Sequence, residues 1–123
     1  MTLLAKRQER SIVPRMYYIT TAIDYTNGPP HIGHAYEKVL ADVLARWHRM
    51  KGEEVYFLTG VDQHGQKVQQ TAEKLGITPQ EHVNNITGQF LALWDRLGIS
   101  NDGWASTTDP RHKACVQKIL TDL

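Results

Sequence analysis

The sequence has almost no cysteine, because Cys115 is the only one among its 123 residues. This excludes a disulfide within the chain and a cysteine-rich zinc site. No apolar run approaches the length that crosses a membrane. The sequence also lacks an excess of positive or negative charge, since 14 basic and 13 acidic side chains leave a net charge of +1. Bulk charge therefore gives no evidence for or against a nucleic-acid partner.

The remaining composition, 41% hydrophobic and 22% charged, is typical of a globular protein with one modest core. With a single cysteine a reducing compartment is the default, and we expect a cytoplasmic protein that is not bound to a membrane. Residues 1–15 are basic and lack clear periodicity. We expect a flexible N-terminal tail there, or a true translation start at Met16, in preference to a weak targeting segment.

The stretch around His31 and His34 organises the rest of the chain. It follows residues 16–23, whose β-branched and aromatic side chains predict a buried strand. Asn27-Gly28-Pro29-Pro30 is turn chemistry, and a helical pattern then extends over residues 33–51. The two histidines therefore lie where a strand passes into a helix, which is where α/β sheets bind their ligands.

This arrangement suits a nucleoside triphosphate. A helix N-terminus has unpaired N–H groups and a partial positive charge, so it attracts phosphate. Histidines there can donate hydrogen bonds to phosphate oxygens and stabilise the charge that develops during attack at phosphorus. Gly33, between the histidines, has no Cβ and lets a flat ring approach the backbone. The spacing also arises by chance, and a histidine pair at a helix start can simply be a polar cap.

The apolar periodicities predict an α/β protein. Strand, helix and strand within this length form a βαβ unit with parallel strands. In the first helix we expect an apolar face toward the sheet, made by Val39, Leu40, Val43, Leu44, Trp47 and Met50. Asp42 and Arg46, four residues apart, are expected to form a solvated ion pair. The further elements predicted are a strand at 54–60, helices at 66–75 and 79–97, a short strand at 104–106 and a helix from residue 110.

Polar residues follow the second predicted strand. Asp62 at its carboxyl end can accept a hydrogen bond from a ligand ammonium group, or it can cap the next helix. His64 is a second candidate, with a plain turn residue as the alternative. Because parallel strands end at the same edge of a sheet, Tyr25 and Asp62 are expected to meet.

These motifs resemble those of the class I aminoacyl-tRNA synthetases, and most closely the methionyl-tRNA synthetase family. The related leucine, isoleucine and valine enzymes usually continue the second motif with Leu-Pro after His-Gly. The resemblance covers roughly residues 16–120. It rests on Tyr25-Thr26-Asn27-Gly28-Pro29-Pro30-His31-Ile32-Gly33-His34-Ala35-Tyr36 and on Val55-Tyr56-Phe57-Leu58-Thr59-Gly60-Val61-Asp62-Gln63-His64-Gly65-Gln66-Lys67.

The resemblance implies ATP-dependent activation of L-methionine to methionyl-adenylate and transfer of the methionyl group to tRNA(Met), with Mg²⁺ accompanying ATP. It makes His31 and His34 the catalytic residues that bind the phosphates. It gives Gly33 to the approach of adenine, and His64 and Gly65 to the ATP side of the pocket. No metal-ligating residue is expected in this chain.

On the methionine side, the resemblance implies that Asp62 holds the amino group while Ile23 and Tyr25 lie beside the side chain. Asp24 departs from the Pro or Tyr expected between them. Alternation along a strand directs Asp24 opposite its neighbours, and we expect it to face solvent.

Several parts of the family's enzymes have no counterpart in the sequence: the Lys-Met-Ser-Lys-Ser loop, the cysteine-bearing zinc knuckle and the anticodon-binding domain. We therefore expect residues 16–123 to be the N-terminal half of a truncated Rossmann-type catalytic domain, an incomplete parallel sheet followed by helices. Such a piece is expected to be inactive alone and to have the missing C-terminal portion as a partner. Zinc is expected only in the missing connective segment, and tRNA contacts in parts largely absent.

Two alternatives remain open. A small adenylyl transferase also has a His-x-Gly-His motif after its first strand, although it has no reason to carry the second motif. The other alternative is a catalytically dead or split-synthetase fragment that only binds.

Overall fold

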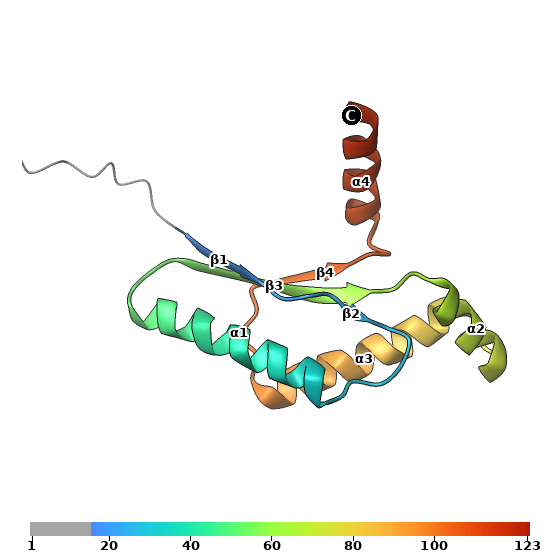
Figure 1. Cartoon of the computed structure of the whole chain (residues 1–123), viewed down its shortest axis with the longest axis horizontal. Helices are drawn as coiled ribbons and strands as arrows, with labels where there is room; N and C mark the ends of the chain where they lie inside the picture. Colours follow the sequence, from blue (N-terminus) through green and yellow to red (C-terminus); the bar gives the residue numbers. More distant parts are fainter. Residues whose placement is uncertain (1–15) are drawn as a thin grey trace, which may run out of the picture.

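The computed structural model describes residues 16–123, which form a parallel sheet and helices (Figure 1). The predicted N-terminal tail, residues 1–15, lies outside the described residues. In chain order the elements are β1 (Tyr17–Thr20), β2 (Asp24–Tyr25), α1 (Ile32–Met50), β3 (Val55–Asp62), α2 (Gln66–Leu75), α3 (Pro79–Leu97), β4 (Gly103–Ser106) and α4 (Pro110–Asp122).

Strand β3 is the centre of the sheet, and every pairing with it is parallel. Leu58 pairs with Thr20 of β1 and with Gly103 of β4, so β1 and β4 lie on opposite edges of β3. Val61 in the same way separates β2 from β4. The predicted α/β class and the parallel pairing within the βαβ unit are thus confirmed.

We predicted one strand over residues 16–23, and that prediction is wrong. The strand breaks after Thr20 and pairing with β3 resumes at Asp24. The cause lies at Ala22, whose N–H donates to Oε1 of Glu37 (3.0 Å) and whose carbonyl accepts from Nζ of Lys38 (3.0 Å). The backbone between β1 and β2 therefore bonds to α1 instead of to β3.

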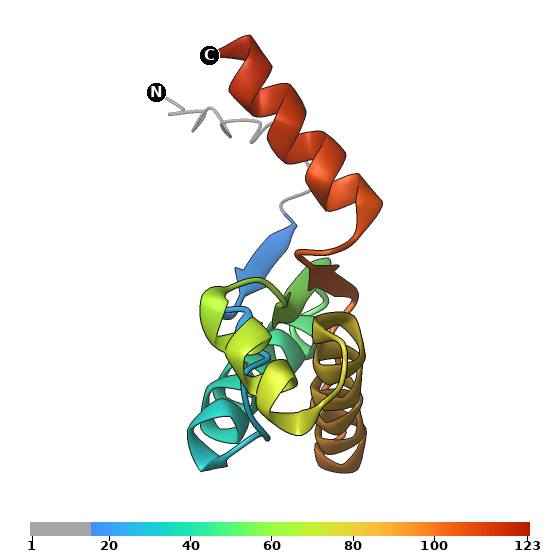
Figure 2. The ribbon, with the colours of Figure 1, turned by 90° about the vertical axis from the view of Figure 1, so that its right-hand side faces the viewer.

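Helices α1 and α3 cover one face of the sheet, and α4 stands away on the other side with no buried residue (Figures 1 and 2). The core lies between the sheet and the two covering helices. Two buried clusters form it: Ala41, Ala45 and Phe57, and Val61, Ile86, Phe90 and Trp94. No helix within residues 16–123 combines the length and the apolar character that a bilayer crossing needs.

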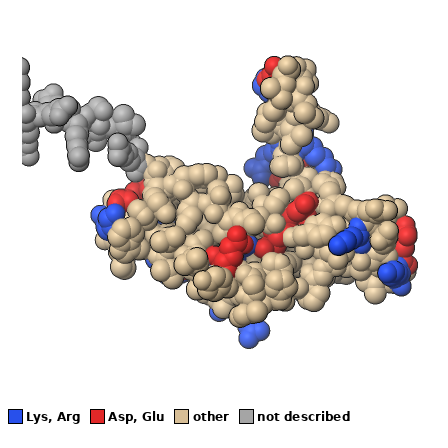
Figure 3. All heavy atoms as spheres, in the orientation of Figure 1, with Lys and Arg blue, Asp and Glu red and all other residues tan. Residues whose placement is uncertain are grey.

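The prediction that the apolar face of α1 packs against the sheet is wrong. Its apolar residues point to solvent, with exposed fractions from 39% at Leu44 to 81% at Met50. Figure 3 shows mostly uncharged atoms over this helix. The residues that α1 buries instead are Lys38, Ala41, Asp42 and Ala45. The alanines let the helix approach the sheet closely, and the two charged residues find partners inside.

Asp42 forms the predicted pair with Arg46 (2.6 Å), but only the Arg46 side chain is solvated, because Asp42 is buried. Its Oδ1 also accepts from the Ser100 N–H (2.7 Å) and the Ser100 hydroxyl (2.5 Å). Burial opposes ionisation of Asp42, but the hydrogen bonds from Ser100 and Arg46 outweigh it and lower the pKa of Asp42. Asp42 thus ties α1 to the segment before β4.

Asp42→Asn is expected to lower the free energy of unfolding by about 1–3 kcal/mol, because an amide cannot accept on both sides as the carboxylate does. Urea unfolding at pH 7 measures this. The control is Asp122→Asn, which breaks the exposed pair with Lys118 (2.6 Å) and should change stability by less than about 1 kcal/mol. Equal effects of the two substitutions would contradict the buried role of Asp42.

Candidate functional site

The candidate site lies where β2 and β3 end and α1 begins. Tyr25 and Asp62 are paired residues in the register of these strands, which confirms the prediction that they meet. The N–H and the hydroxyl of Thr26 both donate to the Asp62 carbonyl (3.0 Å each). This doubled bond, on a threonine with no exposed surface, fixes the end of β2 against the end of β3.

Gly65 lies directly against Tyr25. A Cβ at this position would collide with the Tyr25 hydroxyl, and the Gly65 φ of +138° is in a region that side chains rarely adopt. Gly65 is also the N-cap of α2. The alternative that Asp62 caps this helix is therefore wrong. Oδ1 of Asp62 instead accepts from the His64 N–H and the Thr107 hydroxyl (3.2 Å each).

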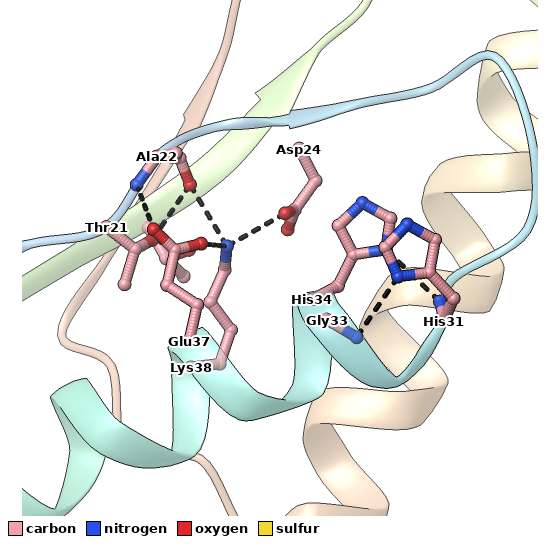
Figure 4. Close-up of polar contacts among 9 residues, drawn as sticks. Thr21, Ala22, Asp24, His31, Gly33, His34, Glu37 and Lys38 are labelled. Atoms are coloured by element: carbon pink, nitrogen blue, oxygen red, sulfur yellow. Dashed lines mark hydrogen bonds and ion pairs between the residues drawn. The ribbon is translucent and has the colours of Figure 1, made fainter.

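His31 and His34 form a capping box at the start of α1 (Figure 4). The Gly33 N–H donates to Nδ1 of His31, and the His31 N–H donates to Nδ1 of His34 (3.1 Å each). An Nδ1 that accepts carries no proton, so the proton of each neutral ring is on Nε2. The rings stack with centroids 3.7 Å apart. The cap and the phosphate-site hypotheses are thus compatible, because the cap uses Nδ1 and leaves Nε2–H as a donor.

His34 is partly shielded, with its ring edge-on to Phe90 at 5.0 Å between centroids. Burial lowers the pKa of His34, and the negative charge of Asp24 opposes this effect in part. The neutral ring with its Nε2–H donor is therefore the favoured form of His34 at neutral pH.

Asp24 does not face solvent, and that expectation is wrong: its exposed fraction is 3%, and Oδ1 pairs with Nζ of Lys38 at 2.8 Å. Alternation did place it opposite Ile23 and Tyr25, but α1 covers that face of the strand. Burial raises the pKa of Asp24 against the hydrogen bond and charge of Lys38. A helix that follows a strand packs back on one face of it. The sequence therefore did carry a sign that Asp24, on that face, would be buried and would need a partner.

One predicted site residue, His64, contacts a different part of the chain from the others. His64 turns toward β4, where its Nε2 lies 3.2 Å from the Thr107 carbonyl oxygen. It lines a cavity of about 280 Å³ together with Thr107 and residues of α4, among them His112 and Lys113. Sequence reasoning missed Thr107 and Lys38 as members of the site. The part of the chain that the structure describes contains no group of three His, Cys, Asp or Glu residues able to hold a metal ion.

Comparison with known proteins identifies the family. The family model described as tRNA synthetases class I (M) matches residues 17–123. The chain belongs to this family. Methionine–tRNA ligase of Deinococcus radiodurans is 50% identical over 107 residues, which are 86% of this chain and 16% of that protein. The Mesorhizobium japonicum enzyme is 52% identical over 103 residues, 84% of this chain and 20% of that one.

A solved relative supports the same family membership and the partial Rossmann-type fold. Mycobacterium tuberculosis methionyl-tRNA synthetase in complex with methionyl-adenylate superposes with a TM-score of 0.78 at 42% identity, covering 80% of this chain and 19% of that one. The chain thus spans about a fifth or less of the length of these relatives. The family match also decides against a small adenylyl transferase.

His34 is expected to titrate below its ordinary value of 6.5, because burial disfavours the imidazolium. Neutral His34 therefore contributes stability that is present above pH 6.5 and lost as the pH falls through the folded pKa. NMR titration of the histidine rings measures the shift. Asp24→Asn should lower the pKa of His34 further, since it removes a nearby negative charge. A value at or above 6.5, or a rise in Asp24→Asn, would count against this account.

Proposed function

We propose that the chain provides part of the active site of a methionine–tRNA ligase. The reaction would join L-methionine and ATP to form methionyl-adenylate and then transfer the methionyl group to tRNA(Met). The observation that carries the proposal is the histidine capping box at the N-terminus of α1, beside the paired ends of β2 and β3. The methionyl-adenylate in the M. tuberculosis relative supports the same substrates.

The phosphates of ATP would lie at the start of α1. His31 and His34 would donate from Nε2 to phosphate oxygens, while the helix N-terminus adds a partial positive charge. The methionine carboxylate attacks the α-phosphorus, a P–O bond forms, and the bond to the leaving pyrophosphate breaks. The two histidines would stabilise the charge that builds up on the pentavalent phosphorus. Adenine would approach the exposed backbone of Gly33, where an added Cβ would press on the His31 ring, and Gly65 would add to the ATP side.

Methionine would lie at the ends of β2 and β3. Both hydrogen bonds to the Asp62 carboxylate from the described residues go to Oδ1, which leaves Oδ2 to accept from the substrate ammonium group. Ile23 and Tyr25 are 41% and 36% exposed on the side opposite Asp24 and would pack against the thioether side chain. His64 would reach ATP only by leaving its present contact with Thr107.

Mg²⁺ would arrive bound to ATP, because it is usually held through substrate phosphates and water with few protein ligands. Zinc, if the whole enzyme binds it, would belong to sequence beyond this chain, as would most contacts with tRNA(Met). The cytoplasm is the proposed location.

A second proposal concerns the partner of the chain. The apolar outer face of α1 is exposed along its length, and the matched residues make up only 16–20% of these relatives. We infer that this face packs against further synthetase polypeptide, either covalently joined or supplied as a separate fragment. On this view the chain alone binds a ligand or the rest of the synthetase but does not catalyse adenylate formation.

The test of the proposed function is His34→Ala in the full-length gene product. Methionine-dependent ATP–pyrophosphate exchange should fall about 10²-fold in kcat, because a phosphate donor is lost. The matched control is Thr78→Ala, which removes another side-chain cap, the Thr78 hydroxyl that accepts from the Glu81 N–H (3.1 Å). Both substitutions should cost about 1 kcal/mol of stability. An unchanged exchange rate in His34→Ala, or an equal loss in Thr78→Ala, would contradict the proposal.

A further inference from the structure

The ammonium group of Lys38 has no exposed surface and donates to one backbone carbonyl and two carboxylates (Figure 4). Nζ donates to the Ala22 carbonyl (3.0 Å), to Oδ1 of Asp24 (2.8 Å) and to Oε2 of Glu37 (2.9 Å). An ammonium has three protons, so its donor capacity is filled. The centroid of the Trp94 ring lies 5.6 Å from Nζ. A charge buried in this way is tolerated only with such partners.

The same contacts hold the link between β1 and β2. The Ala22 N–H donates to the second oxygen of Glu37 (3.0 Å), so both polar groups of Ala22 bond to consecutive residues of α1. Asp24 adds a side-chain bond from β2 to the same lysine. Ile23 lies between these two anchored residues and Tyr25 follows them, and both are exposed whereas Asp24 is buried.

We propose that Lys38 is a positioning residue, which clamps the segment Ala22–Tyr25 to α1 and so sets Ile23 and Tyr25 in place relative to His31 and His34. Lys38 does not touch substrate. It acts through the strand segment that forms the wall for the methionine side chain. This inference rests on the proposed function, because it takes Ile23 and Tyr25 to be that wall.

The histidines should be less sensitive to Lys38 than the wall is. Their capping box is closed within the first turn of α1 and uses no contact with Lys38. Loss of the clamp should therefore weaken methionine binding more than ATP binding. Misplacement of a binding group by about 1 Å can cost up to about a hundredfold in rate, so the effect should be measurable.

The experiment compares Lys38→Met, the double variant Asp24→Asn/Lys38→Met, and Lys51→Met in the full-length gene product. Lys51 is a matched control, since it lies at the other end of α1 in an exposed pair with Glu53. Lys38→Met should raise KM for methionine about tenfold or more and KM for ATP by less than about threefold. Lys51→Met should leave both values unchanged.

The double variant separates positioning from stability. It removes the unpaired buried carboxylate that Lys38→Met leaves behind, so its unfolding midpoint should recover toward that of the unsubstituted enzyme. Its KM for methionine should stay raised, because the Ala22 carbonyl and Glu37 still lack the ammonium. Recovery of KM together with the midpoint, or equal increases in KM for methionine and ATP, would overturn the proposal.

A readout independent of activity is the hydrogen exchange of backbone amides. Lys38→Met should speed exchange at Ala22, while Thr26, which bonds to the Asp62 carbonyl, should keep its protection. Unchanged protection at Ala22 would overturn the clamp whatever the enzyme catalyses. Failure of the proposed function is recognised separately, as an absence of methionine-dependent exchange in the unsubstituted enzyme.

Discussion

The buried Lys38 ammonium is the constraint on which the arrangement of α1 depends. A charge without solvent must keep its three acceptors, and these come from Ala22, Asp24 and Glu37. With Lys38 turned inward, the residues three, four and seven positions later must also face the sheet. Those residues are Ala41, Asp42 and Ala45, and they are the ones that the structure buries. The orientation of the helix that begins with the two histidines thus follows from one ion-pair cluster.

The sequence predicted most elements of the fold well but oriented α1 wrongly. Strand β4 and the ends of α2 and α3, both followed by glycine in the left-handed region, match the predictions closely. The error on α1 arose because the more apolar stripe was assigned to the sheet. The partners that make the other face suitable for burial, Asp24 and Ser100, are far away in sequence from Lys38 and Asp42. Local periodicity carries no information about such pairs.

In the candidate site, too, some features could be predicted from the sequence and others depend on contacts between distant residues. The meeting of Tyr25 and Asp62 could be predicted, because parallel strands share one sheet edge. The cap and the phosphate donor were opposed hypotheses in sequence, whereas the structure shows that His31 and His34 cap with Nδ1 and leave Nε2 free. The position of His64 depends on Thr107, which lies 43 residues later in the chain, and no local signal predicts this contact.

The most direct test of the account is amino-acid-dependent ATP–pyrophosphate exchange by the full-length gene product, measured with methionine, leucine, isoleucine and valine in turn. Tyr25 and Asp62 pair at the ends of β2 and β3, where we propose that methionine binds. The account predicts exchange that depends on methionine and is far slower with the three branched amino acids. Exchange driven by one of those three, or by none of the four, would contradict it.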